Sequence, residues 1–227
     1  MTSPVPTSST EAVPRVLWGD AHLLAVFKPA GMPVQADPTG THDLLSAVRL
    51  MHPGEAIGLP HRIDRPVSGV VLLGRTPEAL QALNRLFRER AVQKTYLAVV
   101  TGAVDGDLTL EHTLFHDAKA HRARVSDRGV PVSLMLRSVL RGDRYTLVEV
   151  RPQGGAFHQI RAQLAAAGHP IRGDVKYGAR RGERDRSIAL HAWSIAMQHP
   201  FTGEALRVEA PLPDTPTWAP WRTIPPA

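Results

Sequence analysis

Residues 61–74 read HRIDRPVSGVVLLG, in which a single aspartate lies between two arginines and a run of apolar residues follows. The apolar run predicts a buried strand, and the prolines on either side of Asp64 favour an extended or turn conformation there. Nearby arginines such as Arg62 and Arg65 keep a carboxylate ionised, and an ionised carboxylate is a poor general base but can be a nucleophile. The alternative is a turn aspartate in a surface ion pair worth roughly 0–1 kcal/mol, and this stretch alone leaves both interpretations open.

The spacing of apolar residues along the rest of the chain predicts one α+β domain. Thr76 suits a helix N-cap and Pro77 the first helical position, and apolar residues three and four apart follow them. Elsewhere, runs of alternating apolar residues between turn residues indicate many adjacent strands and few crossover helices. We therefore expect a mainly antiparallel mixed sheet with helices packed on it, over residues 14–227, behind a disordered tail at residues 1–13.

The expected helices cover residues 43–51, 76–90 and 156–168. The expected strands are a hairpin within residues 16–34 and single runs at 69–75, 94–102, 107–115, 133–140, 144–151, 187–197 and 205–210. Two basic segments, 118–129 and 179–186, are expected to be solvated loops without strands.

Composition favours a polyanionic partner and excludes several kinds of chemistry. Lys and Arg number 27 against 21 Asp and Glu, which gives a net charge of +6 and a pI ≈ 10.3. The absence of cysteine excludes disulfides, zinc-thiolate sites and thiol nucleophiles. No P-loop or GxGxxG motif is present, no apolar run approaches the ~18 residues that span a bilayer, and the first residues do not form a secretory signal. We therefore expect no nucleotide cofactor, no membrane role and a cytoplasmic location.

A second group of polar residues opens the expected helix at 156–168. His158, Gln159 and Arg161 come first, and His158 and Arg161 are three residues apart, so they share one helix face. An arginine in such a place can clamp a carboxylate or a phosphate with two hydrogen bonds. A plain polar helix face explains the same pattern equally well.

A third candidate lies in the expected strand at 94–102, where Lys94 and Tyr96 point to the same face. A core tyrosine with one satisfied hydroxyl is the alternative. A metal site is also conceivable, since four potential ligands cross a strand end into a basic loop: His112, His116, Asp117 and His121.

In their order and spacing, these segments resemble the RluA-type RNA pseudouridine synthases. The resemblance runs from about Val16 to Pro213 and rests on five blocks: DAHLLAVFKPAGMPV, HRIDRPVSGVVLLGRT, KTYLAVVTG, FHQIRAQLAAAGHPIRGDVKYG and ALHAWSIAMQHPFTGEALRVEAPLP. It implies the catalytic domain of an isomerase that converts uridine to pseudouridine in tRNA or ribosomal RNA. That reaction requires neither cofactor nor metal.

By this resemblance, Asp64 is the nucleophile that acts while the glycosidic bond of uridine is broken and the sugar is rejoined to carbon 5. Attack on carbon 6 of the base and attack on the sugar carbon both stay open. Arg161 would be the salt-bridge partner of Asp64, and Tyr96 would stack on the base and assist proton removal. Arg62 would enter the RNA stack where the target base leaves. The full set of expected substrate-binding residues is His61, Arg62, Arg65, Lys94, His158 and Gln159.

Two positions depart from the family pattern and concern the choice of substrate. Ala156 lies where the family usually has an arginine, and Val67 where it often has a threonine. The region before residue 16 is too short for the small RNA-binding module of many relatives, so we expect a catalytic domain that finds its RNA by itself or with its own insert. We also expect a monomer. The rival functions are a non-catalytic RNA-binding protein on the same scaffold and a metal-dependent nuclease that uses His112 and His116.

Overall fold

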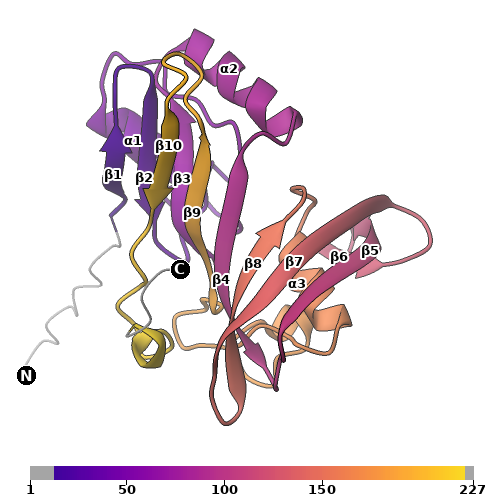
Figure 1. The fold of residues 1–227 in the computed structure, drawn as a ribbon. Coiled ribbons are helices and arrows are strands. Elements are labelled where there is room, and N and C mark those ends of the chain that lie inside the picture. Colours follow the sequence, from indigo (N-terminus) through magenta and orange to yellow (C-terminus); the bar gives the residue numbers. More distant parts are fainter. Residues whose placement is uncertain (1–12, 223–227) are drawn as a thin grey trace, which may run out of the picture.

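The computed structural model describes residues 13–222, whose arrangement is shown in Figure 1. The tail expected at residues 1–13 lies, except for Val13, outside the described residues. The strands are β1 (Arg15–Gly19), β2 (Leu23–Lys28), β3 (Ser68–Gly74), β4 (Gln93–Thr101), β5 (Asp107–Asp117), β6 (Arg122–Val125), β7 (Val130–Arg141), β8 (Tyr145–Pro152), β9 (Leu190–Gln198) and β10 (Ala205–Glu209). The helices are α1 (Leu44–Met51), α2 (Pro77–Arg88) and α3 (Gln159–Ala166), with short 3-10 turns η1 (Val175–Tyr177) and η2 (Ala219–Trp221).

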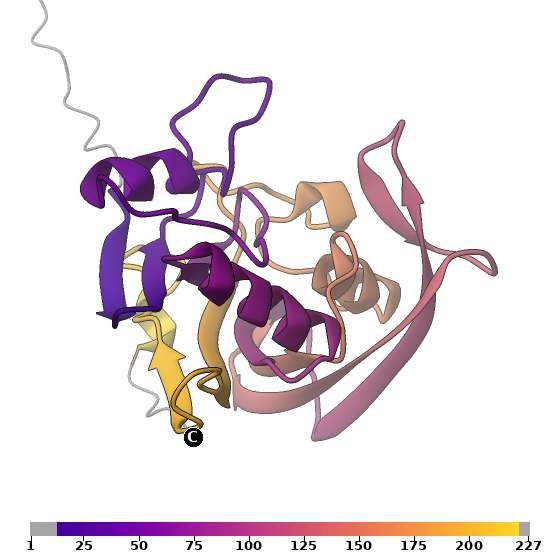
Figure 2. The ribbon, with the colours of Figure 1, turned by 90° about the horizontal axis from the view of Figure 1, so that it is seen from above.

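The strands form one ten-stranded sheet in the order β1-β2-β3-β9-β4-β8-β7-β5-β6, with β10 paired to β9. Every pair of these strands is antiparallel except β3 with β9. The expected α+β fold with a mainly antiparallel mixed sheet is therefore confirmed. Figures 1 and 2 show that the sheet divides near β4: one half carries α1 and α2, and the other, formed by β8, β7, β5 and β6, curves around α3.

The parallel contact between β3 and β9 is short and depends on a glycine. Gly69 has a φ of 128°, and a Cβ atom there would lie 2.2 Å from the carbonyl oxygen of Ala192. Only glycine allows this conformation at this close approach. The pairing covers only Ser68 and Gly69 of β3, so the same edge of the strand further along, at Leu72, is not paired with β9.

The helix expected at residues 76–90 is confirmed as α2. The side chain of Thr76 accepts a hydrogen bond from the backbone N–H of Ala79 at 3.2 Å, and Pro77 takes the first turn. The helix buries Ala79 and Leu83 against β3. None of the helices among residues 13–222 is long and apolar enough to cross a membrane.

Two expectations from the sequence are wrong. The helix expected at 156–168 begins only at Gln159, because His158 has a left-handed backbone (φ 52°, ψ 27°) that no residue inside a helix adopts. The segment 118–129, expected to lack strands, contains β6, which pairs with β5. Ala123 of β6 is 3% exposed and packs in a core cluster, and its backbone N–H donates to the Tyr177 hydroxyl, so this strand is held by burial and pairing that a basic sequence does not reveal. The segment 179–186 has neither helix nor strand, as expected.

Candidate active site

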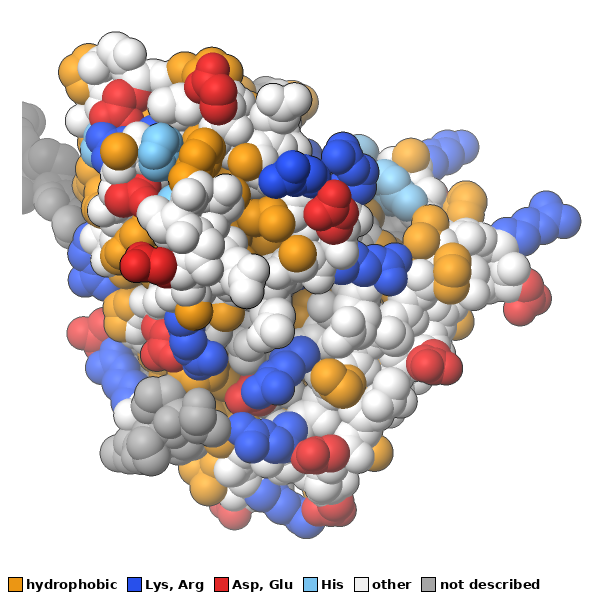
Figure 3. All heavy atoms as spheres, turned by 45° about the horizontal axis from the view of Figure 1, so that its top comes forward, with side chains coloured by type: hydrophobic (Ala, Val, Ile, Leu, Met, Phe, Trp, Pro, Cys, Tyr) orange, Lys and Arg blue, Asp and Glu red, His pale blue; other side chains and the backbone are white. Residues whose placement is uncertain are grey.

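A cavity of about 880 Å³ lies between the Asp64 segment, β4 and the loop before α3. Among the described residues that line it, Asp64 is the one acidic side chain, whereas the basic ones are Arg62, Arg88, Arg90, Lys94, Arg151 and Arg207. Figure 3 shows Lys and Arg side chains gathered between the two halves of the molecule. A cavity with this charge attracts a polyanion and brings it to a single carboxylate.

The C-terminal end of the Asp64 segment is held by a buried lysine and a backbone contact. The carbonyl oxygen of Arg65 accepts hydrogen bonds from the backbone N–H of Gly31 at 2.8 Å and from Nζ of Lys28 at 3.2 Å. Lys28 is 0% exposed and also donates to the carbonyl oxygens of Pro29 and Met32. Burial lowers the pKa of Lys28 to about 7, although the charge of Asp64 acts in the opposite direction.

The N-terminal end of the segment is held by His61. Its Nε2 accepts a hydrogen bond at 2.9 Å from the backbone N–H of Leu72, on the edge of β3 that β9 leaves unpaired. The imidazole stacks on Phe87 of α2 with ring centroids 4.6 Å apart. Burial lowers the pKa of His61 to about 3, so the ring stays neutral and keeps an acceptor for this bond. His61, which was expected to bind substrate, is therefore better placed to position the segment.

Asp64 is joined to Arg161, which is itself held by a second carboxylate. Nη1 of Arg161 donates to Oδ2 of Asp64 at 3.0 Å. On its other side, Arg161 makes a two-bond fork to Asp174, from Nε at 2.7 Å and from Nη2 at 2.8 Å. The guanidinium also lies over the ring of Tyr177, 5.0 Å from its centroid. Arg161 and Asp174 are 5% and 2% exposed, whereas the Asp64 side chain is 27% exposed and reaches the cavity.

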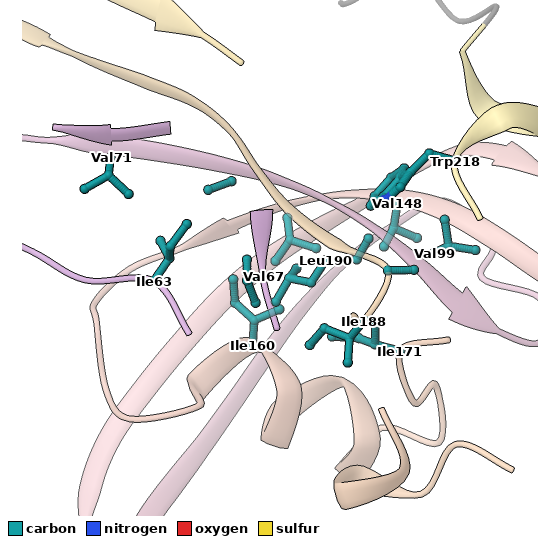
Figure 4. Packing of buried hydrophobic residues seen from close by; sticks show 14 of the residues in the cluster. Ile63, Val67, Val71, Val99, Val148, Ile160, Ile171, Ile188, Leu190 and Trp218 are labelled. Atoms are coloured by element: carbon teal, nitrogen blue, oxygen red, sulfur yellow. The ribbon is translucent and has the colours of Figure 1, made fainter. Parts of the chain in front are cut away.

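The apolar neighbours of these charged residues form a common core beneath them. Ile63 precedes Asp64 and Ile160 precedes Arg161 in the sequence, and both belong to the main hydrophobic cluster. Figure 4 shows Ile160 of α3 lying close to Val67 and Leu190. The carboxylate and the guanidinium are therefore positioned by packing of buried residues as well as by their own contact.

His158 lies on the same side of Asp64 but forms no ion pair with it. Burial, together with the charge of Arg161, lowers the pKa of His158 to about 3, so the ring is neutral. The Tyr177 hydroxyl accepts from the backbone N–H of Ala123 at 2.8 Å and lies 2.9 Å from Nδ1 of His158. Nε2 of His158 faces Oδ2 of Asp64 at 3.6 Å. At this distance the histidine shapes the site without donating a normal hydrogen bond.

Tyr96 and Lys94 line the cavity from β4. Burial and the charge of Asp64 both raise the pKa of Tyr96, so its hydroxyl stays protonated near neutral pH. The ammonium of Lys94 donates to the carbonyl oxygen of Gly154, and burial lowers its pKa. Lys94, expected to bind substrate, therefore ties β4 to the loop before α3.

Of the remaining expected site residues, Arg62 lies at the cavity, whereas Arg65 and Gln159 support the segments around it. Arg62 is exposed and lines the cavity. Arg65 does not line it, because its guanidinium donates to the carbonyl oxygen of Gly31 and to side chains of the loop that contains Asp37. Gln159 is 4% exposed and its amide is engaged by Ala156, Ser133 and Gln163, so it holds the loop rather than substrate. The two arginines that flank Asp64 are therefore not its partners.

Sequence reasoning missed three residues that support the site, namely Lys28, Asp174 and Tyr177. Asp174 and Tyr177 belong to the GDVKYG run after α3, and a carboxylate and an aromatic ring closely following an arginine-bearing helix were the available signal. Lys28 is the last residue of β2 and precedes Pro29, and only its burial reveals a structural role.

The four residues whose spacing made a metal site conceivable, His112, His116, Asp117 and His121, do not form one among the described residues. Within residues 13–222, no group of three or more His, Cys, Asp or Glu side chains is arranged to hold a metal ion. His112 lies 3.3 Å from the amide of Gln163, and His116 packs on Phe157 with ring centroids 4.2 Å apart.

Comparisons with known proteins agree on one family. The model of the RNA pseudouridylate synthase family matches residues 22–166. The chain is 35% identical over 212 residues to ribosomal large subunit pseudouridine synthase C of Pasteurella multocida (strain Pm70), covering 87% of this chain and 64% of that protein. It is 33% identical over 221 residues to ribosomal large subunit pseudouridine synthase D of Nitrosomonas europaea (strain ATCC 19718), covering 90% of this chain and 64% of that protein. Among solved structures, human RNA pseudouridylate synthase domain containing 1 is similar with a TM-score of 0.76 and 26% identity, over 90% of this chain and 85% of that one. The chain thus spans 64% of the length of both curated relatives.

Proposed function

Because this chain belongs to the RNA pseudouridylate synthase family, we propose that it is an RNA pseudouridine synthase with Asp64 as its nucleophile. The observation that carries the proposal is the placement of Asp64, bound to Arg161 at the wall of a cavity whose other charged lining residues are basic. Ribosomal RNA of the large subunit is the first substrate to test, since the relatives are named for it, and tRNA is the second. A cytoplasmic location and a monomeric state belong to the same proposal.

The contacts of the Asp64 carboxylate leave one oxygen for the reaction. Arg161 and His158 both approach Oδ2, at 3.0 Å and 3.6 Å. Among the described residues, no hydrogen bond or ion pair reaches Oδ1. Arg161 directs a two-bond fork to Asp174, from Nε and Nη2, and gives Asp64 a single bond from Nη1, so it engages one Asp64 oxygen. We therefore assign Oδ1 as the attacking atom.

The isomerisation balances without a co-reactant. The bond between N1 of uracil and the sugar carbon C1′ breaks, a bond between C5 and C1′ forms, a proton leaves C5, and N1 takes up a proton. Asp64 forms the transient covalent bond that separates these two steps, either with the base or with the sugar. Tyr96 contacts the base as a neutral phenol, because its raised pKa makes the phenolate scarce. Stacking on the base is therefore the main contribution of Tyr96, and its neutral hydroxyl is the group that would assist removal of the C5 proton.

Arg62 and the other cations bind the RNA around the extruded uridine. A uridine within folded RNA has to leave its stack, at a cost of a few kcal/mol. Arg62 is exposed at the cavity and its planar guanidinium can stack in the resulting gap. Arg88 and Arg90, which also line the cavity, then contact phosphates, which makes binding strongly dependent on salt.

The test uses ribosomal RNA and tRNA from cells that lack this gene, labelled with tritium at C5 of uridine. Wild-type protein should release tritium from one of the two pools, and Asp64→Asn should not, because its amide is neutral and a poor nucleophile. Asp37→Asn is the matched control, since Asp37 pairs with Arg65 outside the cavity. Mapping the product by its modified position then names the substrate.

Three results decide the matter. Release by wild type and Asp37→Asn alone supports the proposal. Release by Asp64→Asn would refute the nucleophile. No release from either pool by a wild-type protein that still binds RNA would favour the non-catalytic RNA-binding protein instead.

A further inference from the structure

A second cavity of about 490 Å³ adjoins the catalytic cavity. The two share Arg90 and the residues from 153 to 157 as lining, so the loop before α3 is a common wall. The shared wall contains Gly154, Gly155 and Ala156, which have little or no side chain to separate the two spaces. We call this second space the annex. Its volume is within the range of small-molecule sites.

The annex is built on the concave face of the sheet half that curves around α3. Leu114 of β5 is 5% exposed and belongs to the core cluster that includes Ala162 of α3. Its direct partners across the sheet are Val130 of β7 and Val125 of β6, and directly paired side chains point to the same face. Val130 lines the annex and is 58% exposed, whereas Val125 is 47% exposed and does not line it. The concave face thus presents an apolar, uncovered side chain to the annex.

Two aromatic rings join this apolar surface to the catalytic residues. His116 lies two residues beyond Leu114 on the same strand face, and its ring centroid is 4.2 Å from that of Phe157. Phe157 stacks in turn on His158, with centroids 3.8 Å apart, and Nε2 of His158 is 3.6 Å from Asp64. A flat ligand in the annex would therefore meet ring edges and faces next to the reacting uridine.

The charge around the annex points to a nucleic acid rather than a peptide or an apolar metabolite. Among its described lining residues none is acidic, and Arg90 lines both cavities. Within residues 13–222, Arg90 forms no ion pair with a carboxylate, so its guanidinium is available to a ligand. A cation on the shared wall suits a phosphate that joins a nucleotide in one cavity to a nucleotide in the other.

We propose that the annex binds the base of an unpaired nucleotide next to the target uridine. This inference rests on the proposed function, because the first nucleotide has to occupy the catalytic cavity. Proteins that recognise RNA commonly hold splayed bases against aromatic and apolar side chains. The annex offers those contacts, a shared wall and a shared cation. Contacts of this kind tolerate different bases, so the annex selects for an unpaired neighbour more than for its identity.

The test is a double-mutant cycle between the protein and the RNA. The probe is the shortest synthetic RNA that still contains the uridine modified by the wild-type protein, with an abasic nucleotide placed on its 5′ or 3′ side. The protein variant is Val130→Trp, which fills the annex, and the matched control is Val125→Trp on the same sheet face. Tryptophan suits a strand, and thermal melting of each variant checks the fold.

An abasic neighbour on one side should lower kcat/KM of the wild type about tenfold, as expected for one lost base stack. The kcat/KM of Val130→Trp on intact RNA should be lower than that of the wild type by a similar factor. Because the annex is already filled in this variant, the abasic nucleotide should lower its kcat/KM further by less than about twofold. Val125→Trp should behave as the wild type does. The annex proposal alone would be overturned if Val130→Trp turned over intact RNA normally and the abasic nucleotide lowered kcat/KM equally in both variants or in neither. No turnover of intact RNA by the wild type would overturn the proposed function, and the annex with it.

Discussion

Replacement of Arg161 by methionine tests the buried charge cluster most directly. Methionine keeps a long, apolar stem in place of the arginine side chain, so packing is largely preserved while the guanidinium is lost. The change removes two hydrogen bonds to Asp174 and one to Asp64. It also removes the cation above the ring of Tyr177.

The size of the effect follows from how deeply each carboxylate is buried. Asp174 is 2% exposed, so removing its partner leaves an unpaired charge in the interior, which typically costs about 3–5 kcal/mol. Asp64 is 27% exposed at its side chain and keeps contact with water, so its share of the loss is small. We therefore expect Arg161→Met to lower the free energy of unfolding by about 3–5 kcal/mol near neutral pH, measured by urea denaturation.

A second substitution separates the unpaired charge from lost packing. Adding Asp174→Asn to Arg161→Met removes the buried charge, so the double variant should recover at least half of the lost stability. A loss by Arg161→Met below about 1 kcal/mol, the range of an exposed ion pair, would refute the reasoning. So would a double variant that is less stable than Arg161→Met alone.

Three further predictions concern the base, the RNA and the pH dependence of stability. Tyr96→Phe should keep most of the activity, whereas Tyr96→Ala should lose roughly 10- to 100-fold in kcat/KM through the missing base stack; equal losses in both would assign the essential role to the hydroxyl. Arg62→Ala should weaken binding of structured RNA and reduce the slope of binding against salt, whereas Arg65→Ala, which lies outside the cavity, should change neither in a filter-binding titration. Burial lowers the pKa of His191 from 6.5 to about 4, so the unfolded chain binds more protons in this interval and stability falls as the pH falls through it. His191→Asn should flatten that fall by up to about 1.4 kcal/mol per pH unit in urea denaturation, and an unchanged slope would contradict a neutral His191.

Local sequence patterns predicted most of the fold because its elements carry local signals. The Thr76-Pro77 start of α2 and the alternation of the strands are read from neighbouring residues. The start of α3 could not be read in this way. His158 takes a left-handed conformation, and its ring contacts Tyr177, which lies 19 residues further along the chain. A helical pattern in the sequence does not reveal such a tertiary constraint.

The candidate site shows the same limit more sharply. The arginines beside Asp64 in sequence are not its partners, because Arg65 donates to the carbonyl oxygen of Gly31 and to Asp37, and Arg62 is exposed at the cavity. The partner, Arg161, is 97 residues away and was expected only through the family resemblance. The sequence places Asp174 shortly after the arginine-bearing helix, but it does not show the burial against Arg161 on which the role of Asp174 depends.

The arrangement around Arg161 also explains how the carboxylate that we propose as nucleophile can be kept in a stable protein. An arginine with a single carboxylate partner favours a two-bond fork, which would engage both oxygens of Asp64. Here Asp174 takes that fork from Nε and Nη2, and Asp64 receives a single hydrogen bond from Nη1. The buried pair therefore carries the structural role, while Asp64, at the cavity, keeps one carboxylate oxygen without a partner among the described residues. Stability and the proposed reactivity are thus assigned to different carboxylates of the same arginine, so a change at Asp174 would act on Asp64 through Arg161.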